Sequence, residues 1–429
     1  MTTADSAKTL NWARNITFSA ARVHRPESLD ELRRAVAAAR SVRALGSGHS
    51  FNRIADTADT LVSVAGLPRE VTVTPASQAA PATARVSAGL RYSEIAEPIH
   101  AAGYALANMA SLPHISVAGA VATGTHGSGN ALGNLATAVS ALRMVGPGGD
   151  VIELGRASDP DRFDGAVVAL GALGVVTEVV LDLVPTFDLA QHVYVGLPLD
   201  ALAAQPAAIF AAAYSVSVFT NWQSGTADVW VKQRADATRE PAPEPAMLGA
   251  LLADRPRHPV PAQPAENVTE LDVPGPWFAR LPHFRPEFTP SSGEELQSEF
   301  FLDRAAVPTA LDELRRLGDR LAPVLQISEL RTIAADGLWL SPAYGRDTAS
   351  FHFTWIEDAG AVDPVLDAVE ERLLPLGARP HWGKVFHVPP SQVSAMYEHA
   401  DDFRGLMRAF DPEGKFRNPF VDGFFPPEA

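Results

Sequence analysis

A glycine-rich turn that carries a histidine constrains this chain more than any other feature of its sequence. Residues 43–51 read RALGSGHSF, in which the apolar strand expected over 42–45 runs into Gly46, Ser47, Gly48 and then His49. Glycine lets the backbone approach a bulky or charged ligand closely, because it has no Cβ to obstruct the approach. The turn therefore predicts a strand that ends at a ligand-binding loop, with an imidazole held at the same place.

The composition excludes several classes of protein. The chain has 429 residues, 46% of them hydrophobic, which is enough for two or three domains with a sizeable core. Its formal charge is −15 and no run of five basic residues interrupts that balance, so we expect no nucleic-acid or membrane partner. The absence of cysteine excludes disulfides, iron–sulfur clusters and cysteine nucleophiles. The N-terminus lacks the pattern of a secretory signal, so we expect a cytoplasmic protein.

Short strands interspersed with helices predict an α+β fold. Ser28 and Glu31 have the spacing of a capping box at the start of a helix. We also expect a helix over 92–102, strands over 60–64, 71–74, 84–88 and 151–154, and a buried strand within 170–185. The stretch 241–290 holds 12 of the 35 prolines together with Trp277, Phe278 and Phe284, which predicts an ordered insertion rather than a disordered linker.

Several common sites are absent from the sequence. The turn at 46–49 lacks the third glycine of a dinucleotide-binding fingerprint, and the five glycines of 111–133 have the wrong spacing for one. No GxSxG, HExxH or P-loop sequence occurs, and the histidines lack metal-ligand spacing. We therefore expect neither a Rossmann site for NAD nor a metal site.

Charged and polar side chains occur on strands that are otherwise apolar. Period-two alternation places Glu329 and Arg331 of LQISELRTI (325–333) on one face, together with leucine and isoleucine. Burying an unpaired charge is costly, so this pair either forms an ion pair or binds a polar ligand, and both interpretations are open. In SFHFTWI (350–356) the aromatic residues share one face, which leaves His352 and Thr354 on the other.

A third polar group lies in ARPHWGKVF (378–386), where His381 and Lys384 stand among aromatic residues. A lysine in such surroundings is commonly a surface residue whose stem packs on apolar neighbours. Three such segments in one region of the chain nevertheless predict a small-molecule pocket with convergent polar groups.

These segments resemble one family. RALGSGHSF, NMASLPHISVAGAVATGTHGSG and LGALGVVTEV are similar to the flavin domain of the vanillyl-alcohol-oxidase-type covalent FAD enzymes. PGPWFARLPHFRPEFTPSSGEELQSEF, SPAYGRDT and RPHWGKVF resemble the alditol (xylitol) oxidases of that family, which are related to the aldonolactone oxidases. The resemblance implies a two-domain α+β fold: an FAD-binding domain over 1–187, a substrate domain with an antiparallel sheet over 188–380, and a return to the first domain over 381–429.

The resemblance also implies the cofactor and the residues that contact it. FAD would be bound covalently through His49 to the methyl carbon on the dimethylbenzene ring of the flavin, and without cysteine no second link can form. Ser111 would contact both FAD and the substrate. The residues expected to bind FAD are Arg43, Ala44, Leu45, Gly46, Ser47, Gly48, His49, Ser50, Ser111, Ser116, Gly119, Thr123, Gly124, Thr125, His126, Val176 and His381.

The implied reaction oxidises the terminal CH2OH of an alditol to the aldose and reduces O2 to H2O2. We expect Arg331 and Lys384 to stabilise the developing alkoxide, His352 to act as general base, and Glu329 to accept hydroxyl hydrogen bonds and orient Arg331. Thr354 would also bind substrate, and Ala110 would lie where O2 reacts. The expected partners are the polyol and O2, with a monomeric protein. The alternatives are an aldonolactone oxidase or dehydrogenase and a non-catalytic polyol-binding protein.

Overall fold

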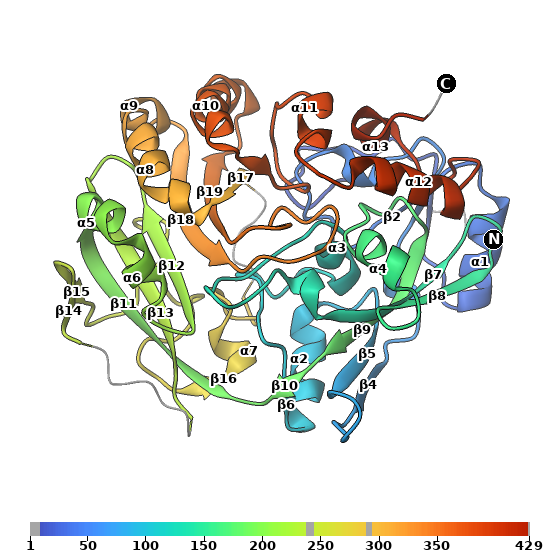
Figure 1. The fold of residues 1–429 in the computed structure, drawn as a ribbon, viewed down its shortest axis with the longest axis horizontal. Coiled ribbons are helices and arrows are strands. Elements are labelled where there is room, and N and C mark those ends of the chain that lie inside the picture. Colours follow the sequence, from blue (N-terminus) through green and yellow to red (C-terminus); the bar gives the residue numbers. More distant parts are fainter. Residues whose placement is uncertain (1–8, 237–243, 289–293, 428–429) are drawn as a thin grey trace.

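The computed structural model describes residues 9–236, 244–288 and 294–427. Figure 1 shows two parts side by side, with the N-terminal and C-terminal segments together in one part and the middle of the chain in the other. The α+β prediction is confirmed. No helix within the described ranges is long and apolar enough to cross a membrane.

The first part contains two sheets that position the turn at 46–49. A parallel three-stranded sheet has the order β1 (Arg22–His24), β3 (Thr60–Val62), β2 (Val42–Ala44), and α1 (Leu29–Ala38) connects β1 to β2. An antiparallel five-stranded sheet has the order β4 (Val71–Thr74), β5 (Thr83–Ser87), β9 (Val175–Asp182), β7 (Val139–Val145), β8 (Val151–Gly155). The remaining elements are α2 (Tyr92–Ala101), β6 (Tyr104–Ala105), α3 (Val117–Ala122), α4 (Pro160–Val167) and β10 (Val184–Pro185).

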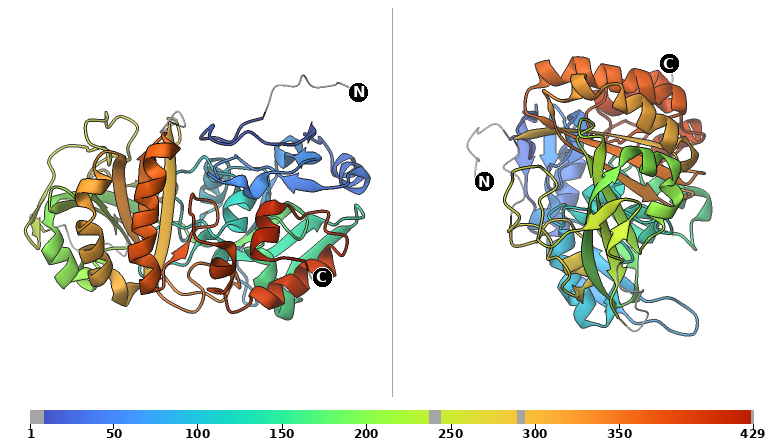
Figure 2. Two further views of the ribbon diagram at one scale, coloured as in Figure 1. Left: turned by 90° about the horizontal axis from the view of Figure 1, so that it is seen from above. Right: turned by 90° about the vertical axis from the view of Figure 1, so that its left-hand side faces the viewer.

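The second part is a ten-stranded sheet with helices packed on one face (Figure 2). The main path of the sheet runs β14 (Ala246–Met247), β15 (Ala250–Leu252), β11 (Asp188–Pro198), β13 (Thr226–Arg234), β12 (Ser215–Thr220), β18 (Leu325–Ile333), β19 (Thr348–Ile356), β17 (Glu295–Asp303), β20 (Arg379–Pro380), and β16 (Gly275–Pro276) pairs with β11. The α-helices on that face are α5 (Leu199–Ala204), α6 (Pro206–Phe210), α8 (Val307–Arg315), α9 (Gly318–Leu321) and α10 (Ala359–Leu373), whereas α7 (Trp277–Arg280) packs through Trp277 into the hydrophobic cluster of the first part.

Alternation along β18 and β19 separates the core from the site. Leu330, Phe351 and Phe353 belong to the buried cluster that also contains apolar residues of α8 and α10. Residues at the intervening positions, such as Glu329 and His352, line a cavity instead. The predicted faces of both strands are therefore confirmed, because successive side chains of a strand point to opposite sides of the sheet.

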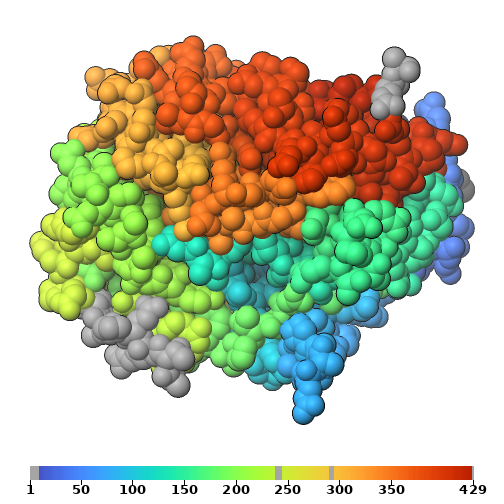
Figure 3. Space-filling model, in the orientation of Figure 1, coloured from blue at the N-terminus to red at the C-terminus, as the bar shows by residue number. Residues whose placement is uncertain are grey.

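The C-terminal helices return to the first part of the chain. They are α11 (Pro390–Ser394), α12 (Ala400–Phe410) and α13 (Pro419–Phe424), and Phe403 and Phe425 share one hydrophobic cluster with Ile95 of α2 and Val179 of β9. In the space-filling view the C-terminal segment, in red, covers one edge of the first part (Figure 3).

The predicted elements agree with the observed ones to within a few residues. The Ser28 hydroxyl accepts a hydrogen bond from the Glu31 amide at 3.2 Å, as expected for an N-cap. The Glu31 carboxylate, however, accepts from the Glu27 amide at 2.9 Å rather than from Ser28. The proline-rich stretch forms β14, β15, β16 and α7 within residues 244–288, where Trp277 is fully buried. Its remaining residues, 241–243 and 289–290, lie outside the described ranges.

Arg43 joins segments that are far apart in the chain. Its buried guanidinium donates hydrogen bonds to the carbonyl oxygens of Gly171 and Phe416 at 3.0 and 2.7 Å, and to those of Ile54 and Leu170, both at 2.5 Å. Burial lowers the pKa of Arg43 to about 10, so the group remains charged at neutral pH. One side chain thus ties the strand before the turn to the C-terminal segment.

We expect Arg43→Met to lower the free energy of unfolding by about 3 kcal/mol, because it leaves buried carbonyl oxygens without their donors. Urea unfolding measures the change. Arg34→Met, at an exposed position of α1, is the control and should change the free energy of unfolding by less than about 0.5 kcal/mol. Equal effects of the two substitutions would contradict this structural role.

Candidate active site

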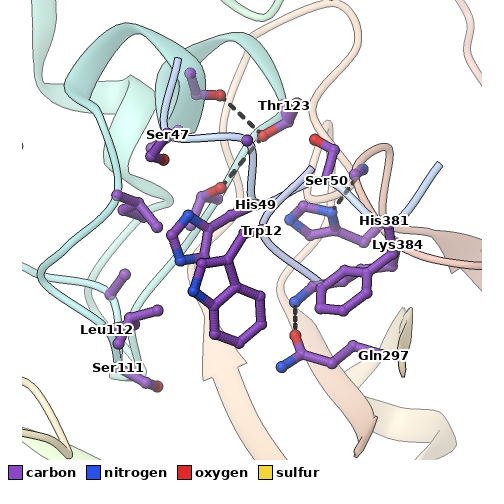
Figure 4. Close-up of a pocket in the computed structure, with 18 of the residues that line it drawn as sticks. Trp12, Ser47, His49, Ser50, Ser111, Leu112, Thr123, Gln297, His381 and Lys384 are labelled. Carbon is purple, nitrogen blue, oxygen red and sulfur yellow. Dashed lines mark hydrogen bonds between the residues drawn. The ribbon is translucent and has the colours of Figure 1, made fainter. Parts of the chain in front are cut away.

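A cavity of about 750 Å³ lies between the two parts of the chain. The turn at 44–52 and the small-residue segment from Ala110 to His126 contribute to one side. Strands β17, β18 and β19 and the segment 381–384 contribute to the other, and part of the proline-rich stretch, from His258 to Phe284, also lines it. Figure 4 shows Ser47, His49, His381 and Lys384 gathered around this space.

The glycine-rich turn fits closely against the start of α3. A Cβ on Gly46 would stand only 2.2 Å from the Ser116 hydroxyl oxygen, and one on Gly119 would stand 2.8 Å from the same atom. The Ser47 amide donates to the Ser116 hydroxyl and the Ser116 amide donates to the Ser47 hydroxyl, each at 3.1 Å. Gly48 has a φ of 73°, which favours glycine. The turn and the helix thus form one rigid, backbone-lined wall.

His49 points its imidazole into the cavity without protein hydrogen bonds. Both ring nitrogens are buried, and neither has a hydrogen-bond partner among the residues that the structure describes. Burial, assisted by the nearby charge of Lys384, lowers the pKa of His49 to about 3, and the Ser47 backbone, which lies near the ring without the geometry of a full hydrogen bond, offsets this only in part. The imidazole is therefore neutral at physiological pH and has a lone pair available for bonding.

A buried ion network occupies the opposite end of the cavity. Arg331 Nη2 lies 2.8 Å from Glu299 Oε1, and Arg331 Nε lies 3.5 Å from Glu329 Oε1. Burial alone would lower the pKa of Arg331, but the two carboxylates raise it above its ordinary value. Burial would likewise raise the pKa of Glu329, whereas Arg331 and then His283 hold it well below its usual range. The expected ion pair is therefore present, and both residues also line the cavity, so that binding of a polar ligand by the pair stays a prediction.

Glu299 of β17 is the central member of the network, and the sequence analysis missed it. Its carboxylate accepts a hydrogen bond from His126 Nε2 at 3.0 Å and lies 3.5 Å from His352 Nδ1, in addition to its contact with Arg331. Burial would raise the pKa of Glu299, but His126, Arg331 and His352 lower it well below the ordinary value. Alternation along 295–303 could have singled it out, since Gln297 and Glu299 share one face and the apolar Leu296, Phe300 and Leu302 lie on the other.

His352, Thr354 and Lys384 complete the polar lining. His352 Nε2 lies 3.3 Å from the Thr354 hydroxyl, and burial lowers the pKa of His352, so its ring is neutral at pH 7. The Lys384 ammonium donates to Gln297 Oε1 and lies 5.1 Å from the centre of the Phe51 ring. Burial lowers the pKa of Lys384 to about 8, partly offset by Glu299.

A second layer, also missed from the sequence, holds this network in place. His283 Nε2 lies 2.7 Å from Glu329 Oε1, and the His283 amide donates to the Ser111 carbonyl at 3.0 Å. The buried ammonium of Lys232 donates to the carbonyl oxygens of three consecutive residues, 280–282, at 2.5 to 2.8 Å. Lys232 therefore fixes the loop that carries His283, and His283 links Glu329 to the backbone of Ser111.

Most of the expected site residues lie on the cavity wall. Gly124 does not: its φ is 67°, and a Cβ there would meet Pro342 at 3.1 Å, so it turns the chain behind the wall. Arg43 reaches the wall, while its guanidinium is engaged by the four carbonyl groups described above. The expected residues that line the cavity are Arg43, Ala44, Leu45, Gly46, Ser47, Gly48, His49, Ser50, Ala110, Ser111, Ser116, Gly119, Thr123, Thr125, His126, Val176, Glu329, Arg331, His352, Thr354, His381 and Lys384.

Comparisons with known proteins identify the family. The chain is 49% identical over 423 residues, 97% of its length and 98% of the relative's, to alditol oxidase of Streptomyces sp. (strain IKD472 / FERM P-14339). This chain belongs to the alditol oxidase family. Residues 20–155 match the FAD binding domain family, and residues 294–423 match the D-arabinono-1,4-lactone oxidase family.

A more distant relative matches nearly the whole chain, and a solved structure shares its fold. The chain is 27% identical to L-gulono-1,4-lactone dehydrogenase of Mycobacterium tuberculosis (strain ATCC 25618 / H37Rv), over 96% of its own length and 97% of the relative's. Cholesterol oxidase from B. sterolicum has the same fold, with a TM-score of 0.78 at 16% identity, covering 98% of this chain and 96% of the other. The predicted vanillyl-alcohol-oxidase-type fold is thereby confirmed.

The cavity wall of this alditol oxidase family member is suited to bind FAD. The matched FAD binding domain contains the turn at 46–49 and the small-residue segment that together form the backbone-lined wall. The cavity is large enough for an extended cofactor, and the two unpartnered nitrogens of His49 face it. Buried polar atoms without partners are rare in native proteins, and those that do occur often face a bound group or take part in catalysis.

Because the pKa of Glu299 is held below its unfolded value of about 4.3, its charge stabilises the fold above that pH and the stabilisation is lost as the pH falls. Between pH 6 and pH 3, we expect the free energy of unfolding, measured with urea, to fall by about 2 kcal/mol more in the wild type than in Glu299→Gln. At pH 6 the variant itself should be less stable by about 3 kcal/mol, since Arg331 loses a charged partner. The exposed Glu97→Gln is the control, and an identical pH response in all three proteins would contradict the network.

Proposed function

We propose that this protein is an FAD-dependent oxidase that converts the terminal CH2OH of an alditol, such as xylitol or sorbitol, to the aldose and reduces O2 to H2O2. One observation carries the proposal: a single cavity joins a wall suited to FAD to a buried cluster of two carboxylates, a guanidinium and an ammonium. Such a cluster provides several hydrogen-bonding partners for a chain of hydroxyl groups. The 49% identity to an alditol oxidase supports this substrate class over the lactones of the 27% relatives.

The cofactor is proposed to bind along the backbone-lined wall. The amides of the turn from Arg43 to Ser50 would hold its pyrophosphate, and the lining residues Ser111, Ser116, Gly119, Thr123, Thr125, His126, Val176 and His381 would contact it, with Gly124 shaping the wall from behind. His49 would form a covalent bond to the methyl carbon of the flavin ring. When bound, FAD would supply the redox chemistry, as acceptor of hydride from the alcohol carbon and as donor of two electrons to O2. The sequence contains no cysteine, so a cysteinyl link cannot form.

The protein's own groups would bind the alcohol and move its proton. Glu329 would accept hydrogen bonds from the polyol hydroxyls, and Ser111 and Thr354 would hold further hydroxyls. His352, kept neutral by burial, is suited to take the hydroxyl proton at Nε2, the nitrogen nearer Thr354. Arg331 and Lys384 would stabilise the negative charge that develops on the alcohol oxygen. Glu299 does not need to touch the substrate: it holds Arg331 and His352 in place.

Ala110, a buried residue of the cavity wall, would lie near the edge of the flavin that reacts with O2 and would tune the access of O2. We further propose that the cavity lies between two domains. The FAD-binding domain would comprise residues 1–187 with the returning segment 381–429, and the substrate domain would comprise residues 188–380. We also propose that the enzyme acts in the cytoplasm as a monomer.

The substrate class is tested by H2O2 release in air-saturated buffer with xylitol, sorbitol and gulonolactone on one purified sample. We expect peroxide from both polyols and little from the lactone. Peroxide from the lactone alone would contradict the alditol assignment and leave FAD binding intact. A yellow protein that releases peroxide from none of them would contradict the oxidase assignment.

The pKa of about 8 at Lys384 predicts how activity responds to pH. The ammonium is charged below this value, so kcat/KM for xylitol should fall as the pH rises through about 8. Lys384→Arg keeps the charge and should move this fall to higher pH, whereas Lys384→Met should lose about 10²–10³-fold at pH 7. An unchanged alkaline limb in the arginine variant would contradict the role of Lys384.

A further inference from the structure

An N-terminal loop at residues 9–18 holds the turn that carries His49. The Trp12 amide donates to the Gly48 carbonyl at 2.8 Å, and the Asn11 side-chain amide donates to the Ser50 carbonyl at 3.0 Å. The Asn15 side-chain amide reaches the next carbonyl, that of Phe51, at 3.0 Å. These bonds fix the backbone on both sides of His49.

The same loop places an aromatic ring against the imidazole. The Trp12 and His49 ring centroids are 4.7 Å apart and the two planes differ by 18°, a stacked arrangement that Figure 4 shows within the cavity. Trp12 itself lines the cavity. The stack contacts the face of the imidazole and leaves both ring nitrogens free at its edge.

This way of holding a histidine differs from the way the neighbouring ones are held. His126 is held by hydrogen bonds at both ring nitrogens, to the Gly127 carbonyl and to Glu299. His381 Nδ1 accepts a hydrogen bond from the Gly383 amide at 3.0 Å. The χ2 torsion of histidine has broad minima, so a ring without hydrogen bonds needs another restraint to keep one orientation. For His49, the stacked ring of Trp12 provides this restraint among the residues that the structure describes.

We propose that Trp12 is a positioning residue that orients His49 for bond formation to the flavin. The inference rests on the covalent link under the proposed function. In that step the unprotonated imidazole nitrogen would form a bond to the flavin methyl carbon, which loses one hydrogen as a proton, and the other ring nitrogen would lose its N–H proton. Two electrons remain on the flavin and pass to O2, which takes up the two protons as H2O2.

The test follows FAD attachment rather than turnover. Full-length wild type, Trp12→Ala and Trp12→Phe are produced under riboflavin limitation and then incubated with FAD. Bound FAD is measured by absorbance after gel filtration, and attached FAD by intact mass after acid denaturation. Trp339→Ala is the matched control, because Trp339 is also half-buried and stacks on a histidine, His399, with an interplanar angle of 18°, away from the cavity wall.

We expect Trp12→Ala to bind FAD and to attach it at least about tenfold more slowly than wild type, because reacting groups that are misplaced lose much of the benefit of proximity. Trp12→Phe keeps an aromatic face and should attach FAD within about threefold of the wild-type rate. Trp339→Ala should match wild type.

Four results would overturn the inference. The first is attachment by Trp12→Ala at the wild-type rate. The second is an equal loss of attachment in Trp12→Ala and Trp12→Phe, and the third is a loss of FAD binding in Trp12→Ala; either of these indicates that Trp12 supports the structure of the turn instead. The fourth is wild-type protein that binds FAD without a mass increase. This result overturns the covalent link itself, and it differs from the first two because they require attachment in wild type.

Discussion

The arrangement of the site depends on one buried guanidinium. Arg331 lies between the carboxylates of Glu299 and Glu329 in the interior of the molecule, where an unpaired charge would be strongly destabilising. Each carboxylate in turn holds a histidine: Glu299 contacts His126 and Glu329 contacts His283. A chain of ion pairs and hydrogen bonds therefore links β17 and β18 with the segments that carry His126 and His283, and the positions of the polar groups in the cavity follow from it.

Elements distant in sequence converge on this network because of the sheet register. Strand β19 lies between β17 and β18, and His352 is paired with Glu299 on one side and with Glu329 on the other. The three side chains thus lie in one row across the sheet, on the face opposite the apolar core. The helices cover the core face, which leaves the polar face free to meet the FAD-binding part of the chain.

Local patterns in the sequence predicted the elements and much of the cavity wall. The faces of β18 and β19 could be assigned because alternation is a local property, and the ligand-binding turn because glycine and histidine follow a short strand. His283 and Lys232 were missed because their partners come from strands and loops distant in sequence, whereas alternation along β17 could have assigned Glu299 to a polar face. Trp12 was missed for the same reason, since it lies in a short loop without periodicity and meets His49 only through the fold. The resemblance to a known family supplied the cofactor, which no periodicity could reveal.

The role of the buried network is tested most directly by a crystal structure of the FAD-loaded protein with xylitol bound. We predict that the polyol lies between the flavin and the ion network, with hydroxyl oxygens within hydrogen-bond distance of the Glu329 carboxylate and the Lys384 ammonium. A polyol bound elsewhere, or a flavin ring placed away from Glu329, Arg331 and His352, would contradict the claim that the buried network is the substrate site.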